Sequence, residues 1–153
     1  MPAAAKQARS ITVAALWRND DRERICMQFE HFGINVPDVA AMAEWYVKNC
    51  NMKIVRAIPK PNQTHFLADE KGKVCMEIYT NPNAAVPDYS SEHPLRFHFA
   101  FAVSNPAALK EKLVAAGATV FEELKLGDGS HIITLRDPWG VPFQLCNRTK
   151  PMI

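Results

Sequence analysis

The organisation of this chain can be read outward from one stretch, Glu30-His31-Phe32-Gly33-Ile34-Asn35-Val36-Pro37-Asp38. Its apolar side chains alternate with small or polar ones, the period-two pattern of a half-buried strand. The pattern directs His31 away from the core, on the same side as a glycine and an amide. Pro37 ends the strand, and Asp38 is suited to cap a following helix. The stretch therefore predicts a strand, a turn and the start of a helix.

The same arrangement occurs a second time, 67 residues later, as His98-Phe99-Ala100-Phe101-Ala102-Val103-Ser104-Asn105. A second pair of segments keeps this offset, because Glu77 lies 46 residues after His31 and Gln144 lies 46 residues after His98. Each of these two side chains stands between core hydrophobic residues of a predicted strand. The chain is therefore interpreted as an internal duplication, with one histidine and one oxygen ligand in each copy.

Composition narrows the classes of function. The chain has 153 residues, enough for one compact unit or two small fused ones, and its net charge is only +2 without a basic cluster. A nucleic-acid partner is therefore not expected. No apolar run approaches the roughly 20 residues of a membrane span. The 4 cysteines form no CxxC pair, which favours a reducing cytoplasm.

Four segments can be delimited. Residues 1–26 do not belong to the repeat and are expected to be a flexible N-terminal extension, with an arm on a second subunit or a targeting peptide as alternatives. Residues 27–80 form the first module and 95–148 the second. A linker, 81–94, contains 3 prolines and no periodic pattern.

Each module is predicted to have the order β-α-β-β-β. Apolar residues at helical spacing follow Asp38 and, in the second copy, Asn105 and Pro106, with Gly117 as the helix stop. Strands are expected at Lys53–Ile58, Thr64–Ala68, Val74–Tyr79, Leu95–Val103, Thr119–Lys125, His131–Arg136 and Pro142–Asn147. The fold class is thus α+β.

His31, Glu77, His98 and Gln144 all project from the side opposite the core residues of their strands. Edge-to-edge packing of the two modules would bring these sides into one concave surface. Two imidazoles, a carboxylate and an amide oxygen would suit one divalent transition metal with open positions for water or substrate. Zinc, nickel, cobalt, manganese and iron all remain possible.

The duplication resembles the vicinal oxygen chelate superfamily, through His-Phe-Gly-Ile-Asn-Val-Pro-Asp in the first copy and Asp-Pro-Trp-Gly-Val-Pro-Phe-Gln in the second. This superfamily includes glyoxalase I, methylmalonyl-CoA epimerase, extradiol dioxygenases and bleomycin-binding proteins. The resemblance covers about residues 28–148. It implies a curved, eight-stranded incomplete barrel around a cavity, and it places metal ligands at His31, Glu77, His98 and Gln144.

Bacterial-type glyoxalase I is similar at three of these four positions, but it commonly has a glutamate where this chain has Gln144. An amide can ligate through oxygen but cannot accept a proton, which leaves Glu77 as the candidate catalytic base. Asn81 stands where glyoxalase I has a glutathione-contacting asparagine, whereas Asn35 replaces an expected arginine, so a glutathione adduct is not favoured. Asn35, Tyr79 and Asn81 are weaker candidates for substrate contacts.

Two classes of function follow from the resemblance. The first is a metal-dependent lyase or isomerase that acts on a small oxo- or hydroxy-compound or a thioester through a metal-stabilised enediolate. The second is a metal-free binding protein of the bleomycin-resistance type, and an extradiol dioxygenase is a third, less favoured reading. Exposed strand edges favour a homodimer. Whether one chain or two form each site stays open.

Overall fold

A computed structural model describes residues 28–61 and 63–152 of the chain. The expected N-terminal extension, residues 1–26, lies outside this part. Within the described residues, eight strands and two helices follow one another in the order predicted from the sequence: β1 (Phe32–Asn35), α1 (Val39–Cys50), β2 (Lys53–Ile58), β3 (Thr64–Ala68), β4 (Val74–Tyr79), β5 (Phe99–Ala102), α2 (Pro106–Ala115), β6 (Thr119–Lys125), β7 (His131–Arg136) and β8 (Pro142–Asn147).

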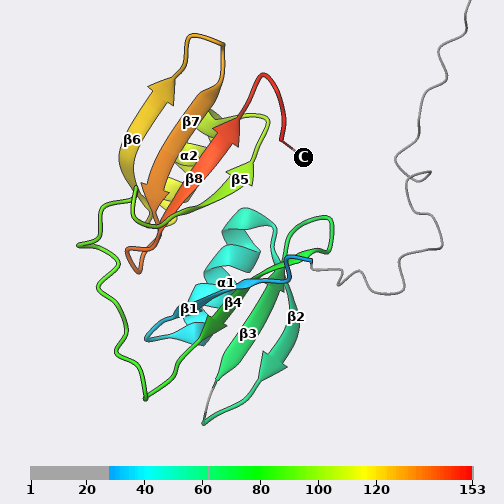
Figure 1. Cartoon of the computed structure of the whole chain (residues 1–153), viewed down its shortest axis with the longest axis vertical. Coiled ribbons are helices and arrows are strands. Elements are labelled where there is room, and N and C mark those ends of the chain that lie inside the picture. The colour runs from blue at the N-terminus through cyan, green and yellow to red at the C-terminus, as the bar shows by residue number, and fades with distance from the viewer. Residues whose placement is uncertain (1–27, 62, 153) are drawn as a thin grey trace, which may run out of the picture.

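The two modules have the same topology (Figure 1). The strand order is β1-β4-β3-β2 in the first sheet and β5-β8-β7-β6 in the second, and the first strand of each module is parallel to the last. Phe32 pairs with Met76, and Phe99 pairs with Phe143, so the offset of 67 residues is kept in the pairing itself. The structure therefore confirms the duplication. Each sheet is open, and the residues that the structure describes form no closed barrel.

The helix ends follow the caps expected from the sequence. Oδ1 of Asp38 accepts a 3.0 Å hydrogen bond from the backbone N–H of Ala41, and Oδ1 of Asn105 accepts one of 3.1 Å from Ala108. Gly117 follows α2 with a φ of 97°, a left-handed conformation that glycine adopts without steric cost. Equivalent polar caps thus start both helices.

One strand is shorter than expected. The alternation predicts a strand over Leu95–Val103, whereas β5 covers only Phe99–Ala102. The preceding residues are held in a turn, because the N–H of Arg96 donates a 2.8 Å hydrogen bond to the carbonyl of His93. This local turn leaves His98 immediately before β5, as His31 lies immediately before β1.

The two modules meet through their apolar sides and share one hydrophobic core. The rings of Trp45 and Tyr46, on α1, lie 6.3 and 6.5 Å from the ring of Phe143 on β8. Phe32 and Phe99, which are equivalent in the duplication, lie 5.2 Å apart. Packing is therefore not the edge-to-edge arrangement considered from the sequence, because α1 and the core-facing aromatic rings occupy the space between the modules.

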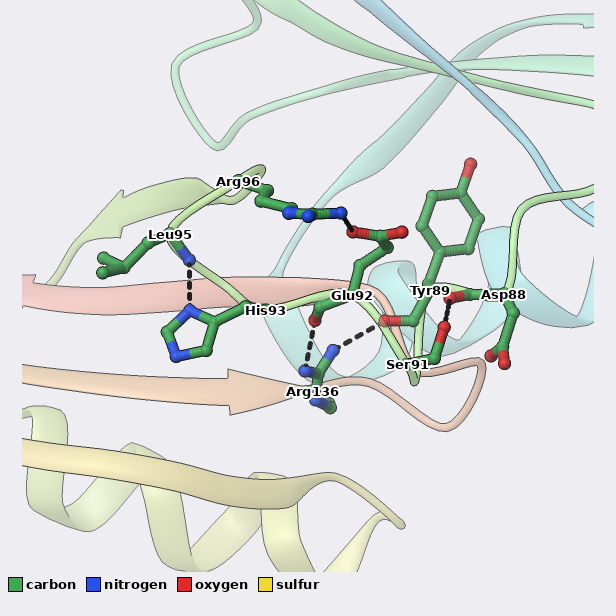
Figure 2. A network of polar contacts seen from close by, with 8 residues as sticks. All are labelled: Asp88, Tyr89, Ser91, Glu92, His93, Leu95, Arg96 and Arg136. Atoms are coloured by element: carbon green, nitrogen blue, oxygen red, sulfur yellow. Dashed lines mark hydrogen bonds and ion pairs between the residues drawn. The ribbon is translucent and has the colours of Figure 1, made fainter.

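The linker is fastened to the second module by Arg136, at the end of β7 (Figure 2). Its guanidinium donates hydrogen bonds to the backbone carbonyls of Tyr89 (2.7 Å), Gly140 (3.0 Å) and Glu92 (2.6 Å). It also lies over the ring of Phe121, 5.6 Å from the centroid.

Among the described residues, no helix has the length and hydropathy needed to cross a bilayer.

Candidate metal half-sites

His31 and Glu77 come together on the polar face of the first sheet. Glu77 on β4 pairs with Gly33 on β1, so His31 is its diagonal neighbour two residues earlier on the parallel strand. Nε2 of His31 lies 3.2 Å from Oε2 of Glu77, and both side chains are partly exposed. The spacing of 46 residues thus corresponds to a direct contact.

Gly33 keeps the space that the carboxylate occupies. A Cβ at this position would lie 3.0 Å from Oε2 of Glu77 and 3.1 Å from Cε1 of Tyr79. Any larger residue would therefore push at least one of these side chains away. The sequence alternation indicated the side on which Gly33 lies but not this close approach.

Both histidines have their Nδ1 atoms held by oxygen acceptors. Nδ1 of His31 lies 2.6 Å from Oε2 of Glu30, and Nδ1 of His98 lies 2.7 Å from the carbonyl oxygen of Pro94. Such partners orient an imidazole and favour the tautomer that leaves the lone pair on Nε2, the arrangement found for metal-ligating histidines. Glu30 and the Pro94 carbonyl were not predicted. Of these two partners, only Glu30 could have been suggested by the sequence, because it directly precedes His31.

The distance between His31 and Glu77 suits a shared metal ion. With the Nδ1–H of His31 directed at Glu30, the lone pair on Nε2 faces the Glu77 oxygen, 3.2 Å away. A metal ion next to both atoms would accept a lone pair from each. Ligands about 2.1 Å from one divalent ion lie about 3.0–3.4 Å apart, so the observed distance fits two adjacent metal ligands.

The second candidate half-site consists of the residues equivalent to His31 and Glu77, which are His98, immediately before β5, and Gln144 on β8. Gln144 pairs with Ala100 and with Thr134, and its Nε2 donates a 3.2 Å hydrogen bond to the hydroxyl of Thr134. This bond directs the amide nitrogen to Thr134 and leaves Oε1 with only a weak 3.8 Å contact from the thiol of Cys146. Burial raises the pKa of the Cys146 thiol, which therefore stays protonated at neutral pH. An amide oxygen is thus available as a ligand.

The described part of the chain, 28–61 and 63–152, contains no group of three His, Cys, Asp or Glu side chains placed to hold a metal ion. The fold accounts for this result. His31 and Glu77 alternate with core residues of the first sheet, and His98 and Gln144 alternate with core residues of the second. Because the apolar sides of both sheets share one core, the two polar faces point away from it. One chain therefore presents two separate candidate half-sites.

The weaker candidates lie around the first half-site. Gly33, Thr64, Glu77, Tyr79, Thr80 and Asn81 line an open pocket of about 490 Å³. Asn35 is buried, and its amide holds the linker, donating to the carbonyl of Ala84 (2.9 Å) and accepting from the N–H of Asn81 (3.0 Å). The structure thus places Tyr79 and Asn81 on the pocket wall and gives Asn35 a supporting position behind it.

A known protein family matches most of the chain. Residues 28–145 match the model of the Glyoxalase/Bleomycin resistance protein/Dioxygenase superfamily. The chain therefore belongs to this superfamily, as the resemblance of its motifs indicated. Among curated proteins, no significant match is found.

Solved structures share the fold at low sequence identity. Glyoxalase I from Zea mays is 22% identical with a TM-score of 0.63, over 79% of this chain and 44% of that chain. A family enzyme from Burkholderia phytofirmans PsJN is 21% identical (TM-score 0.62, over 77% of this chain and 96% of that chain). The glyoxalase family protein from Enterococcus faecalis is 22% identical (TM-score 0.59, 78% and 97%). The chain spans less than half of the maize protein.

Proposed function

We propose that this protein is a metal-dependent lyase or isomerase of the glyoxalase type that acts on a small oxo- or hydroxy-compound or a thioester. The observation that carries the proposal is the matched setting of His31 and His98. In each case Nδ1 is held by an oxygen acceptor, and Nε2 is left as the ligand atom. A binding protein without a metal has no need of this arrangement in both modules.

The proposed site takes His31 and Glu77 from one chain and His98 and Gln144 from a second copy. This division is supported by the opposite directions of the two polar faces within one chain. It is also supported by apolar side chains next to the histidines, since Phe29 is 79% and Leu95 is 80% exposed. β1 and β5 are edge strands, each with one unpaired side. A homodimer that places β1 beside β5 of the other copy would cover these edges.

In the proposed reaction, Glu77 moves the proton. A proton next to a carbonyl is too weakly acidic to be removed at neutral pH without help, and a bound divalent ion would supply the charge that stabilises the developing anion. Glu77 takes the proton from carbon and returns it, because it is the one carboxylate among the four proposed ligands. Gln144 cannot accept a proton, so both transfers occur on one face and the reaction is stereospecific.

Metal content tests the proposal directly. The full chain, purified and dialysed without chelator, is expected to carry about one divalent ion per chain, drawn from Zn, Ni, Co, Mn or Fe, and His98→Ala is expected to lose it. His93→Ala is the matched control, because His93 is exposed in the linker, and its ring contacts Phe121 on β6 and not the proposed ligands. A wild-type protein without metal, or full metal retention in His98→Ala, would contradict the proposal.

A ligand-binding protein is the second candidate. It is favoured by a pocket of about 510 Å³ between β5 and the C-terminal segment, with Phe101, Val103, Cys146 and Met152 among the lining residues. An apolar cavity of this size suits a small organic ligand. The same metal analysis separates the candidates, because the binding protein would contain no stoichiometric metal and would be unaffected by His98→Ala.

A further inference from the structure

Strand β2 carries a bulge that changes the direction of Arg56. Ile54 pairs with Leu67, but the next pair is Arg56 with Phe66, so Val55 is the extra residue. In a regular register Val55 would stand opposite Phe66, and Arg56 would stand opposite His65 on the core side. The bulge therefore places a cation on the polar face of the sheet, an effect for which bulges near functional sites are known.

Arg56 belongs to the same row of side chains as the first half-site. Arg56 pairs with Phe66, Phe66 pairs with Glu77, and Glu77 pairs with Gly33, so all four positions lie on one face. The guanidinium carbon lies 5.9 Å from the centroid of the Phe66 ring. The His31 ring lies 5.6 Å from the same centroid, in an edge-to-face arrangement. Phe66 thus forms a flat apolar surface between the cation and the half-site.

The guanidinium of Arg56 has no carboxylate partner among the described residues. Arg96, by comparison, forms a 2.8 Å ion pair with Glu92. The second module has the same bulge, between Val120 and Glu122, but the residue turned onto its polar face is the acidic Glu122. The positive charge beside the half-site is therefore a property of the first module and not a consequence of the repeated fold.

We propose that Arg56 is a specificity-determining residue that binds an anionic oxygen group of the substrate, a carboxylate or a phosphate, while the substrate chain lies over Phe66. This inference rests on the proposed function for the place of the reacting atoms. The guanidinium carbon is at most 11.5 Å from the centre of the His31 ring, the sum of the two distances to Phe66. The substrate would thus carry its anionic group a few carbon atoms from the reacting oxygens. The planar guanidinium matches carboxylate and phosphate oxygens in pairs.

Matched hydroxamates test this inference. A hydroxamate presents two neighbouring oxygens to a metal, and the probes are glutarate monohydroxamate, its methyl ester and the phosphonate of equal chain length. Calorimetric titration of the Zn²⁺-loaded full chain should show about tenfold or tighter binding of one anionic probe relative to the ester. Whether the carboxylate or the phosphonate binds more tightly identifies the preferred anion.

Variants assign the effect to Arg56. In Arg56→Gln the preference for the anionic probe should fall to about twofold or less, with unchanged affinity for the ester, and Arg56→Lys should keep part of it. Lys48→Gln is the control, because it removes an exposed cation on α1, the helix that packs on the core side of the sheet, and it should keep the full preference. A preference unchanged in Arg56→Gln, or an equal loss for the ester and the anion, would overturn the assignment.

A second measurement does not depend on metal. The Nε–Hε resonance of Arg56, assigned by its absence in Arg56→Gln, should shift in a saturable manner when glutarate or inorganic phosphate is added to the metal-free full chain. If no hydroxamate binds through metal, the proposed function fails, and this titration still decides the role of Arg56. A resonance that does not move with either anion would overturn the inference.

Discussion

The hydroxyl of Tyr46, on α1, donates a 2.8 Å hydrogen bond to Oδ2 of Asp137, in the turn between β7 and β8. Both residues are buried, and the bond joins the first module to the second inside the shared core. Oδ1 of Asp137 accepts two more hydrogen bonds, of 2.9 Å each, from the N–H groups of Trp139 and Val141. One carboxylate thus shapes a turn in its own module and holds the helix of the other.

This carboxylate should make stability depend on pH. Burial raises the pKa of Asp137 from 3.8 to about 6, although its hydrogen bonds act in the opposite direction. Because the folded state favours the protonated form, the ionised group destabilises the fold above pH 6, and this cost disappears as the pH falls from 6 towards 4. Its contribution to the free energy of unfolding should therefore rise by up to about 3 kcal/mol between pH 7.5 and 4.

Asp137→Asn isolates this contribution. The amide oxygen can still accept from the two N–H groups of the turn, but the side chain no longer titrates. Urea unfolding at a series of pH values should show that the difference in the free energy of unfolding between wild type and variant changes between pH 7 and 4. Glu111→Gln changes an exposed carboxylate on α2 and should leave the pH dependence of the free energy of unfolding as in the wild type. If this free energy changed with pH in the same way in the wild type and in Asp137→Asn, the prediction would be contradicted.

Arg136 should stabilise the linker. Its guanidinium donates to three backbone carbonyls, two of them in the linker, and hydrogen bonds from a charged group contribute about 1.5–3 kcal/mol when they are partly buried. Arg136→Met keeps the aliphatic stem and removes the donors. The free energy of unfolding is expected to fall by about that amount, with faster hydrogen exchange in residues 88–96.

Arg96→Met is the control for this experiment. Arg96 lies just after the linker and contacts it, but its ion pair with Glu92 is exposed, and such pairs contribute about 0–1 kcal/mol. A smaller loss of stability is therefore expected, without faster exchange at Tyr89. Equal effects of the two substitutions would show that the carbonyl contacts of Arg136 do not hold the linker.

Much of the fold was accessible from the sequence because its determinants are local. The strand at β1 is set by alternation around Phe32 and Ile34, and both helices start at residues whose side chains cap them, Asp38 and Asn105. Because the chain is duplicated, the elements identified in one module predict those of the other, and equivalent strands pair in the same way in both modules. The shorter β5 was missed because the alternation of Leu95, Phe97 and Phe99 continues through the turn of residues 93–96, and Pro94 was interpreted as the end of the linker and not as part of a turn.

The packing of the modules was less accessible. Alternation shows which face of a strand is apolar, but it does not show what covers that face. Phe32 could have packed against its own helix alone, whereas it also contacts Phe99 of the other module. Arg56 was missed for a similar reason, because the bulge that turns it onto the polar face depends on the partner strand and leaves no mark in the local sequence.

Mixing two defective variants should restore metal binding if each site is shared between chains. His31→Ala and His98→Ala each remove one histidine from every site of a homodimer. In a mixed dimer, one site combines the intact first module of one chain with the intact second module of the other. Co-refolding equal amounts should therefore recover about a quarter of the sites, the statistical share expected for a symmetric dimer.

The control for this mixing experiment is His31→Ala with His31→Ala/His98→Ala. This mixture has no chain with an intact first module, so no site should be recovered. Metal content after co-refolding is measured together with mass in solution. If the site were built within one chain, the first mixture would recover no metal either, and the shared site would be refuted.

Glu77→Gln should separate metal binding from proton transfer. The amide oxygen can replace the carboxylate as a ligand, so the variant is expected to retain metal with reduced affinity, but it cannot accept a proton. The rate at which the proton next to the carbonyl exchanges for deuterium, followed by NMR over a panel of small oxo- and hydroxy-compounds and thioesters, should fall by about 10²–10⁴-fold.

Glu30→Gln gives the contrast. Glu30 contacts Nδ1 of His31 and is not one of the four proposed ligands. Its loss should therefore weaken metal binding by about 10–100-fold. The rate of proton exchange by the fully metal-loaded variant should stay near that of the wild type. Glu77→Gln with full metal and full exchange would remove Glu77 as the base. Efficient turnover of the methylglyoxal–glutathione adduct would overturn the choice of substrate class, which depends on the absence of an arginine at Asn35.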